Sequence, residues 1–170
     1  MKVIIAGSRE SSQIDMDNAL TQCPWINFIS VVVSGTAKGA DKLGEQWAKQ
    51  RNLIIEKYPA DWEKYGKKAG PIRNQLMAEN ADGLIALWDN KSRGTKSMID
   101  SAKNCGLRIF IFDFKNNSLT HINPTKAIGQ KWEQAEERAG IKEHDAGLMR
   151  SEAERLAGAA VAAEFKTSNP

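Results

Sequence analysis

The chain has 170 residues, which is enough for one domain with a hydrophobic core and too few for two full-sized domains. Hydrophobic residues make up 41% of the chain and charged residues 26%, as is ordinary for a soluble globular protein. The net charge of +3 suits a small anionic ligand and is weak evidence for a nucleic-acid partner, which would favour a concentrated basic face.

The two cysteines, Cys23 and Cys105, lie far apart and lack the spacing of a disulfide framework or a zinc site. The apolar run at residues 3–6 is too short for a signal peptide, and no run approaches the length of a membrane span. We therefore expect a cytoplasmic protein without a membrane segment, a bound metal or a cofactor.

Five short apolar runs predict strands, at residues 3–6, 29–33, 53–58, 83–88 and 107–113. They are rich in Val and Ile and lack polar alternation, as expected for strands buried on both faces of a parallel sheet. The segments between them have helical periodicity, and Met98, Ile99 and Ala102 share one helix face. The sequence thus predicts an α/β fold with a Rossmann-like, doubly wound parallel sheet, in which ligands bind beyond the carboxyl ends of the strands.

The character of the sequence changes from Thr120 onward, and residues 126–139 and 144–165 predict helices. We expect a sheet domain at residues 1–118 and a helical C-terminal extension at residues 119–170. The extension either packs on its own domain or joins copies of the chain. We expect a homo-oligomer.

The first predicted strand is followed by a loop at residues 7–9. Gly7 lets the backbone approach a ligand, Ser8 offers a hydroxyl group, and the guanidinium of Arg9 can bind phosphate oxygens. An ordinary strand-to-helix turn with a solvated Arg9 explains the same residues.

The second predicted loop, at residues 34–41, ends in a helix start. Its backbone N–H groups can form a cradle for phosphate. The loop supplies two glycines and three polar side chains: Gly35, Gly39, Ser34, Thr36 and Lys38. It lacks the Gly-Lys-Ser/Thr ending of a P-loop and the full Gly-x-Gly-x-x-Gly pattern of a dinucleotide fold. Asp41 can cap the helix or bind a ribose hydroxyl.

Candidate groups also lie between the third and fourth predicted strands. Trp62 can stack on a base, and Asp61 can accept a hydrogen bond from an amino group or a sugar hydroxyl. Trp62 is otherwise an aromatic side chain at the edge of the core. Pro71 predicts a helix start, so Arg73 and Asn74 would point at the strand ends from the first turn. For Arg73 the alternative is a surface ion pair.

After the fourth predicted strand, Ser92, Gly94 and Thr95 form a hydroxyl-rich loop that leads into a helix and suits an anion. Neither His121 nor His144 falls near these loops, and no Ser-His-Asp order or His-Glu-x-x-His spacing is present. The loops together predict one anion site without histidine-based catalysis.

Five segments taken together resemble the YspA-like branch of the SLOG superfamily, at residues 7–9, 33–41, 60–62, 69–74 and 92–95. The resemblance covers roughly residues 1–113 and implies a nucleotide or nucleotide-derived ligand where the strand order reverses. The superfamily includes the cytokinin-activating LOG phosphoribohydrolases, the DNA-processing protein DprA and nucleotide-sensing domains of bacterial defence systems.

The chain departs from the LOG enzymes in their two motifs. Residues 73–77 match the Arg-Lys-x-x-Met motif except that Asn74 replaces Lys. In the Pro-Gly-Gly-x-Gly-Thr-x-x-Glu motif, Gly94 and Thr95 match, but Met98 occupies the position of the catalytic Glu. N-glycosidic cleavage needs a carboxylate near the sugar, so the LOG reaction is not carried over. The carboxylates that could substitute are Asp61, Asp89 and Asp100.

Residues 34–41 also resemble the corresponding loop of DprA, which raises single-stranded DNA as a ligand. The mild charge and the scattered tryptophans do not predict a basic groove with stacking aromatics. Our leading prediction is a protein that binds a nucleotide or another phosphorylated ribose, as a sensor or a sequestering protein. The alternatives are a hydrolase of nucleoside phosphates or ADP-ribose-like compounds, and DprA-like binding of single-stranded DNA.

Overall fold

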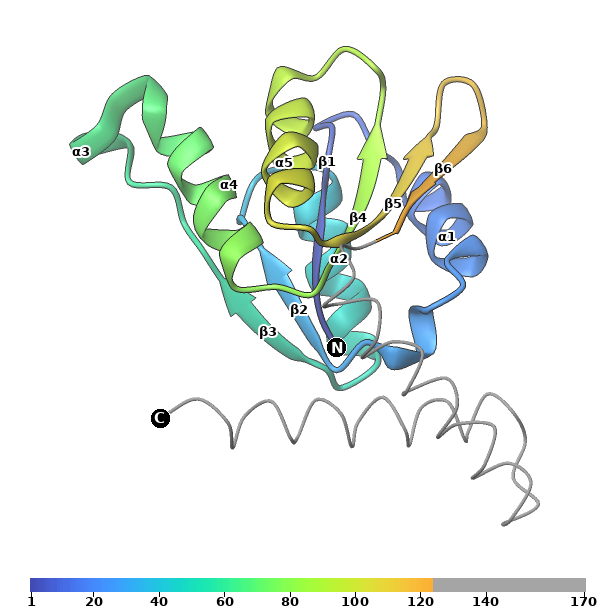
Figure 1. Cartoon of the computed structure of the whole chain (residues 1–170). Coiled ribbons are helices and arrows are strands. Elements are labelled where there is room, and N and C mark those ends of the chain that lie inside the picture. The colour runs from blue at the N-terminus through green and yellow to red at the C-terminus, as the bar shows by residue number, and fades with distance from the viewer. Residues whose placement is uncertain (124–170) are drawn as a thin grey trace.

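Six strands form one sheet in the order β3-β2-β1-β4-β5-β6 in the computed structural model, which describes residues 1–123 (Figure 1). Strands β1 to β5 are parallel, and β6 is antiparallel to β5. The strands are β1 (Lys2–Gly7), β2 (Val31–Ser34), β3 (Ile54–Lys57), β4 (Gly83–Trp88), β5 (Arg108–Asp113) and β6 (Ser118–Ile122). The five predicted strands are thus confirmed, and the Rossmann-like parallel sheet gains one antiparallel edge strand that was not predicted.

Helices cover both faces of the sheet (Figure 1). They are α1 (Gln13–Gln22), α2 (Ala40–Gln50), α3 (Trp62–Tyr65), α4 (Ala69–Glu79) and α5 (Arg93–Asn104), with 3-10 turns η1 (Ile26–Phe28) and η2 (Gly66–Lys68). Alternate residues of each central strand enter opposite cores: Ile5 packs with α1 and α2, whereas Ile4 packs with α4 and α5. Burial on both faces explains the continuous apolar runs of these strands.

The strand order reverses between β1 and β4. The chain runs from β1 through β2 to β3 on one side, then crosses to β4 and β5 on the other. The carboxyl ends of β1 and β4 are joined directly, because the amide of Ser8 donates to the carbonyl of Leu87 at 2.9 Å. In sheets of this type the crevice at this reversal is the usual ligand site.

The predicted boundary after residue 118 falls at the first residue of β6, and the pairing of β6 with β5 carries the sheet on to Ile122. Both helices predicted at 126–139 and 144–165 lie outside the described residues. Within residues 1–123, no helix has the length and apolar character that a bilayer crossing requires.

Candidate functional site

Helix α4 connects two of the predicted loops through adjacent side chains. Arg73 donates from a terminal guanidinium nitrogen to the carbonyl oxygen of Gly35, and its Nε donates to Asn74 Oδ1 at 3.0 Å. Asn74 in turn donates to the carbonyl of Gly94 and to Ser97 Oγ, each at 3.3 Å. Arg73 and Asn74 therefore hold the β2–α2 loop and the first turn of α5 together.

The β2–α2 loop is closed by side chains that bind its own amides. Ser34 Oγ accepts from the amide of Thr36 at 3.0 Å and donates to Glu45 Oε1 at 2.7 Å. Asp41 Oδ2 accepts from the amide of Ala37 at 3.3 Å. Thr36 has a φ of 62°, so the chain turns sharply at a non-glycine residue. Asp41 thus organises the loop, whereas the predicted cap of α2 by Asp41 is not seen, because the N-cap residue is Gly39 and no side chain within residues 1–123 caps the helix.

Gly35 lies between two charged groups. A Cβ atom at this position would collide with the Arg73 guanidinium and would lie 2.8 Å from Asp41 Oδ2. Burial raises the pKa of Asp41, although the nearby Arg73 and two backbone N–H groups act in the opposite direction. Burial lowers the pKa of Arg73, and Asp41 counteracts this shift. Arginine remains protonated under such shifts, so the site carries a partly buried cation.

The β1–α1 loop packs tightly against its neighbours. A Cβ atom on Gly7 would collide with the carbonyl of Leu87, and one on Gly39 would lie 2.5 Å from the carbonyl oxygen of Ser8. Gly39 also has a φ of +80°, which favours glycine. Ser8 is buried, and its Oγ accepts from the amide of Asp89 at 3.3 Å. Ser8 is therefore a link between β1 and β4.

The β4–α5 loop is held by Asp89 and Ser92. Asp89 Oδ1 accepts from the amides of Lys91 and Ser92 at 2.9 and 2.7 Å. Burial alone would raise the pKa of Asp89, but these amides and the Ser8 hydroxyl outweigh it and keep the pKa below its usual value. Ser92 caps α5, and its Oγ accepts from the amide of Thr95 at 3.3 Å and from the Thr95 hydroxyl at 3.0 Å.

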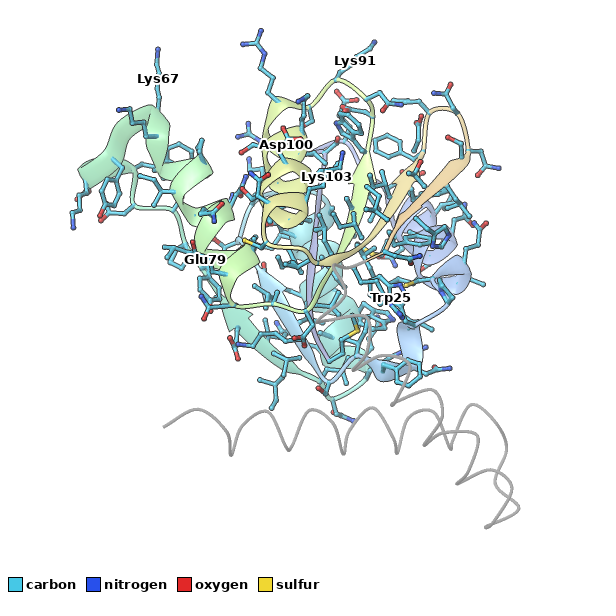
Figure 2. The ribbon with its side chains drawn as sticks, viewed as in Figure 1. Trp25, Lys67, Glu79, Lys91, Asp100 and Lys103 are labelled. Carbon is cyan, nitrogen blue, oxygen red and sulfur yellow. The ribbon has the colours of Figure 1, made fainter. Side chains whose placement is uncertain are left out.

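Several polar groups at the rim of these loops face solvent. Arg9, Lys38 and Lys91 are exposed, and Figure 2 shows Lys91 extending outward from the β4–α5 loop. Among the described residues, none accepts a hydrogen bond from the amide of Lys38 or Gly39. The first-turn amides of a helix lack intrahelical acceptors, so α2 and α5 both present N–H groups at this rim.

Asp61 and Trp62 lie apart from these loops, on a projecting segment of residues 59–68 that we call the arm (Figure 1). Asp61 caps α3, its Oδ1 accepting from the amide of Lys64 at 2.9 Å. Trp62 is 59% exposed, and its ring lies 3.5 Å from where a Cβ on Gly70 would be. The structure does not bring Trp62 to the strand ends, and Asp61 shares with Arg73 only the lining of the hollow described next.

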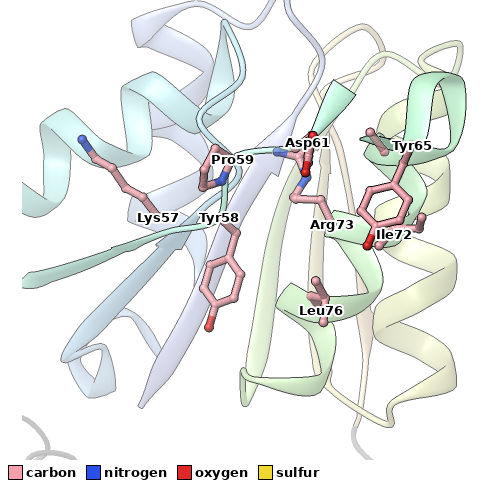
Figure 3. Close-up of a pocket in the computed structure, with 10 residues that line it drawn as sticks. Lys57, Tyr58, Pro59, Asp61, Tyr65, Ile72, Arg73 and Leu76 are labelled. Carbon is pink, nitrogen blue, oxygen red and sulfur yellow. The ribbon is translucent and has the colours of Figure 1, made fainter. Parts of the chain in front are cut away.

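A hollow of about 200 Å³ separates the arm from α4 (Figure 3). Figure 3 shows Tyr58 and Pro59 on one side, Ile72 and Leu76 on the α4 side, and Asp61 and Arg73 toward one end. Its lining is Lys57, Tyr58, Pro59, Ala60, Asp61, Tyr65, Ala69, Ile72, Arg73 and Leu76. Arg73 is the residue that this hollow shares with the Gly35 loop. The aromatic lining was not predicted, because Tyr58 ends an apolar run and Tyr65 lies in a polar segment.

Met98 occupies the predicted position of the LOG glutamate and lies in the core between α5 and the sheet, 2% exposed. The candidate substitutes are engaged elsewhere: Asp61 and Asp89 cap backbone amides, and Asp100 pairs with Lys96 at 3.0 Å. Across residues 1–123, no three His, Cys, Asp or Glu side chains are placed to share a metal ion.

Comparison with known proteins agrees with this architecture. Residues 1–65 match the family model described as the YspA, cpYpsA-related SLOG family. The chain is 37% identical over 91 residues to the Gene 61 protein of Mycobacterium phage D29, covering 50% of this chain and 73% of the phage protein.

The fold is also similar to the X-ray structure of DNA processing protein A (DprA) from Streptococcus pneumoniae. The TM-score is 0.54 at 20% identity, over 65% of this chain and 49% of the DprA chain. This chain therefore spans about half the length of that DprA chain, and the likeness establishes the fold alone. With the strand order, the loops and the sequence matches in agreement, the chain belongs to the YspA, cpYpsA-related SLOG family.

Proposed function

We propose that this protein binds a nucleotide or another phosphorylated ribose at the crevice where the strand order reverses. The observation that carries the proposal is the position of Arg73, which reaches from α4 to the carbonyl of Gly35 beside the first turn of α2. A guanidinium has five N–H donors, and the bonds to Gly35 and Asn74 leave others for a phosphate oxygen. Helix amides at the same rim add further donors for an anion.

Binding without cleavage is the form of the proposal that the side chains support. Met98 supplies no charge to an oxocarbenium-like transition state, and Asp89 is held by two backbone amides of its own loop. We therefore infer a sensor or a sequestering protein. Release of free base or ribose 5-phosphate from a nucleotide incubated with the protein would favour the hydrolase alternative.

The test is the affinity for ribose 5-phosphate measured by calorimetry. The Arg73→Ala substitution removes a charge-assisted hydrogen bond that contributes about 1.5–3 kcal/mol to binding. The expected loss of affinity is roughly 10- to 150-fold. Lys103→Ala removes an equal charge from the last turn of α5 and is expected to leave the affinity unchanged. Equal affinities of the wild type and the Arg73→Ala variant would contradict the proposal.

Single-stranded DNA is a second candidate ligand, favoured by one observation on the arm. Two exposed aromatic side chains, Trp62 and Tyr65, lie among the exposed Lys64, Lys67 and Lys68, and Figure 2 shows Lys67 extending into solvent. Stacking aromatics beside basic side chains are typical of single-strand binding. This candidate predicts that an oligonucleotide binds with steep salt dependence and that Trp62→Ala weakens it, with ribose 5-phosphate having no measurable affinity.

A further inference from the structure

The hollow between the arm and α4 is the strongest candidate for a further ligand-binding surface. Its volume is about 200 Å³, whereas pockets that enclose a drug-sized ligand measure about 300–1,000 Å³. The hollow therefore has room for one part of a ligand rather than for a whole nucleotide.

The lining of the hollow suits a flat, largely apolar ring. Tyr58 and Pro59 form one side, and Tyr65, Ile72 and Leu76 face them from the arm and from α4 (Figure 3). Tyr65 and Leu76 are 41% and 47% exposed, so their apolar surfaces are open to a ligand. A planar heterocycle that contacts tyrosine rings and aliphatic side chains buries both of its faces.

The charged residues Lys57, Asp61 and Arg73 line the hollow, and Asp61 and Arg73 lie toward one end of it (Figure 3). Asp61 Oδ1 caps α3, and its Oδ2 has no hydrogen bond within residues 1–123. Because Arg73 also contacts the Gly35 loop, a ligand whose phosphate binds this guanidinium has its remaining part next to the hollow. The occupant that fits both observations is the part of a nucleotide beyond its phosphate and sugar.

We propose that the hollow lined by Tyr58, Tyr65 and Leu76 is the subsite for the nucleobase of the ligand whose phosphate is held by Arg73. This inference rests on the proposed function and adds that recognition of the base comes from the tyrosines of the hollow rather than from Trp62. Asp61 accepts a hydrogen bond from an exocyclic amino group of the base, which makes adenine a better occupant than hypoxanthine.

The experiment compares AMP with ribose 5-phosphate by calorimetry, since these ligands differ by the base alone. Stacking is worth about 1–3 kcal/mol per base, so the wild type is expected to bind AMP about 5- to 150-fold more tightly. Tyr65→Ala is expected to remove most of that advantage and to leave the dissociation constant for ribose 5-phosphate unchanged. Trp62→Ala, which removes the exposed aromatic side chain outside the hollow, is expected to keep the advantage.

The possible failures have different signatures. Equal affinity of the wild type for AMP and ribose 5-phosphate overturns the base subsite and leaves the phosphate site standing. If the tighter binding of AMP is lost in Trp62→Ala and kept in Tyr65→Ala, the base binds outside the hollow and the inference is overturned. Binding of neither ligand contradicts the proposed function, and the subsite with it.

Discussion

The loops at the ends of β1, β2 and β4 and the arm at residues 59–68 flank the same arginine, yet they are built in opposite ways. The loops bury Ser8, Ser34 and Asp41, whose polar atoms are bonded to backbone or side-chain partners. The arm has no buried residue in α3 or η2. A preformed loop keeps the entropic cost of binding low, whereas an open arm accepts different occupants. The difference separates the preformed loops of the proposed anion site from an open surface.

The largest contrast is expected from the same substitution in each region. Gly7→Ala places a Cβ against the carbonyl of Leu87 and 2.9 Å from Ala40 Cβ, both within the closely packed strand ends. Such overpacking is expected to lower the free energy of unfolding by about 1–3 kcal/mol. Gly70→Ala, next to the arm, meets only Trp62 at 3.5 Å and is expected to raise it by about 0.5–1 kcal/mol. Urea denaturation measures both, and equal effects would remove the contrast.

Asn74 tests the hydrogen bonds that join the loops. Asn74→Ala leaves the carbonyl of Gly94 and the Nε of Arg73 without their partner, which is expected to cost about 1–3 kcal/mol of unfolding free energy. The neighbouring Gln75→Ala removes contacts to Glu79 and Cys105 at the helix surface and is expected to change stability by less than about 0.5 kcal/mol. A smaller effect at Asn74 than at Gln75 would argue against a rigid junction.

The charge of Asp89 gives the loops a pH dependence. Its pKa is lower in the folded protein than the usual 3.8, so the carboxylate stabilises the fold above that pH and the contribution is lost as the pH falls through the folded pKa. Asp89→Asn is expected to cost about 1 kcal/mol at pH 7, because hydrogen bonds to a charged acceptor are stronger. The difference from the wild type is expected to shrink below pH 3.8. A constant difference across pH would rule out this role of the charge.

The smallest effect is expected on the arm, where Asp61 is exposed to solvent. The wild type is expected to bind AMP several-fold more tightly than IMP, since IMP lacks the amino group, and Asp61→Asn is expected to reduce that ratio. Water screens an exposed carboxylate, which limits its hydrogen bond to about 1 kcal/mol or less. Competition calorimetry with the two nucleotides measures the ratio, and an unchanged ratio in the variant would exclude Asp61 from base recognition.

The sheet and the loops were predictable for the same reason. Strands buried on both faces have continuous apolar sequences, so β1, β2, β4 and β5 were recognisable from their residues alone. A parallel topology then places the loop after each strand at one edge, which predicted that Gly35, Arg73 and Gly94 would come together. The contacts of Arg73 and Asn74 fulfil that expectation.

Sequence reasoning was weaker wherever exposure decides the role of a residue. Strand β6 was missed because four of its five residues are exposed and carry no apolar run. Trp62 was favoured over Tyr65 as an aromatic ligand contact because it follows a strand end, but only the folded arm shows that Tyr65 lines the hollow. The pairing of Asp89 with amides and Ser8 likewise depends on the β1–β4 junction, which joins residues 81 positions apart.

The central claim is that the crevice beside Arg73 binds the phosphate of a ribose ligand. A titration of isotope-labelled protein with ribose 5-phosphate, followed by NMR, tests it most directly. We predict that the largest chemical-shift changes occur at the backbone amides of Lys38, Gly39 and Gly94 and at the Nε–H of Arg73. A titration with ribose, which lacks the phosphate, is expected to produce none of these changes. Changes confined to other parts of the chain, or equal changes with ribose, would contradict the claim.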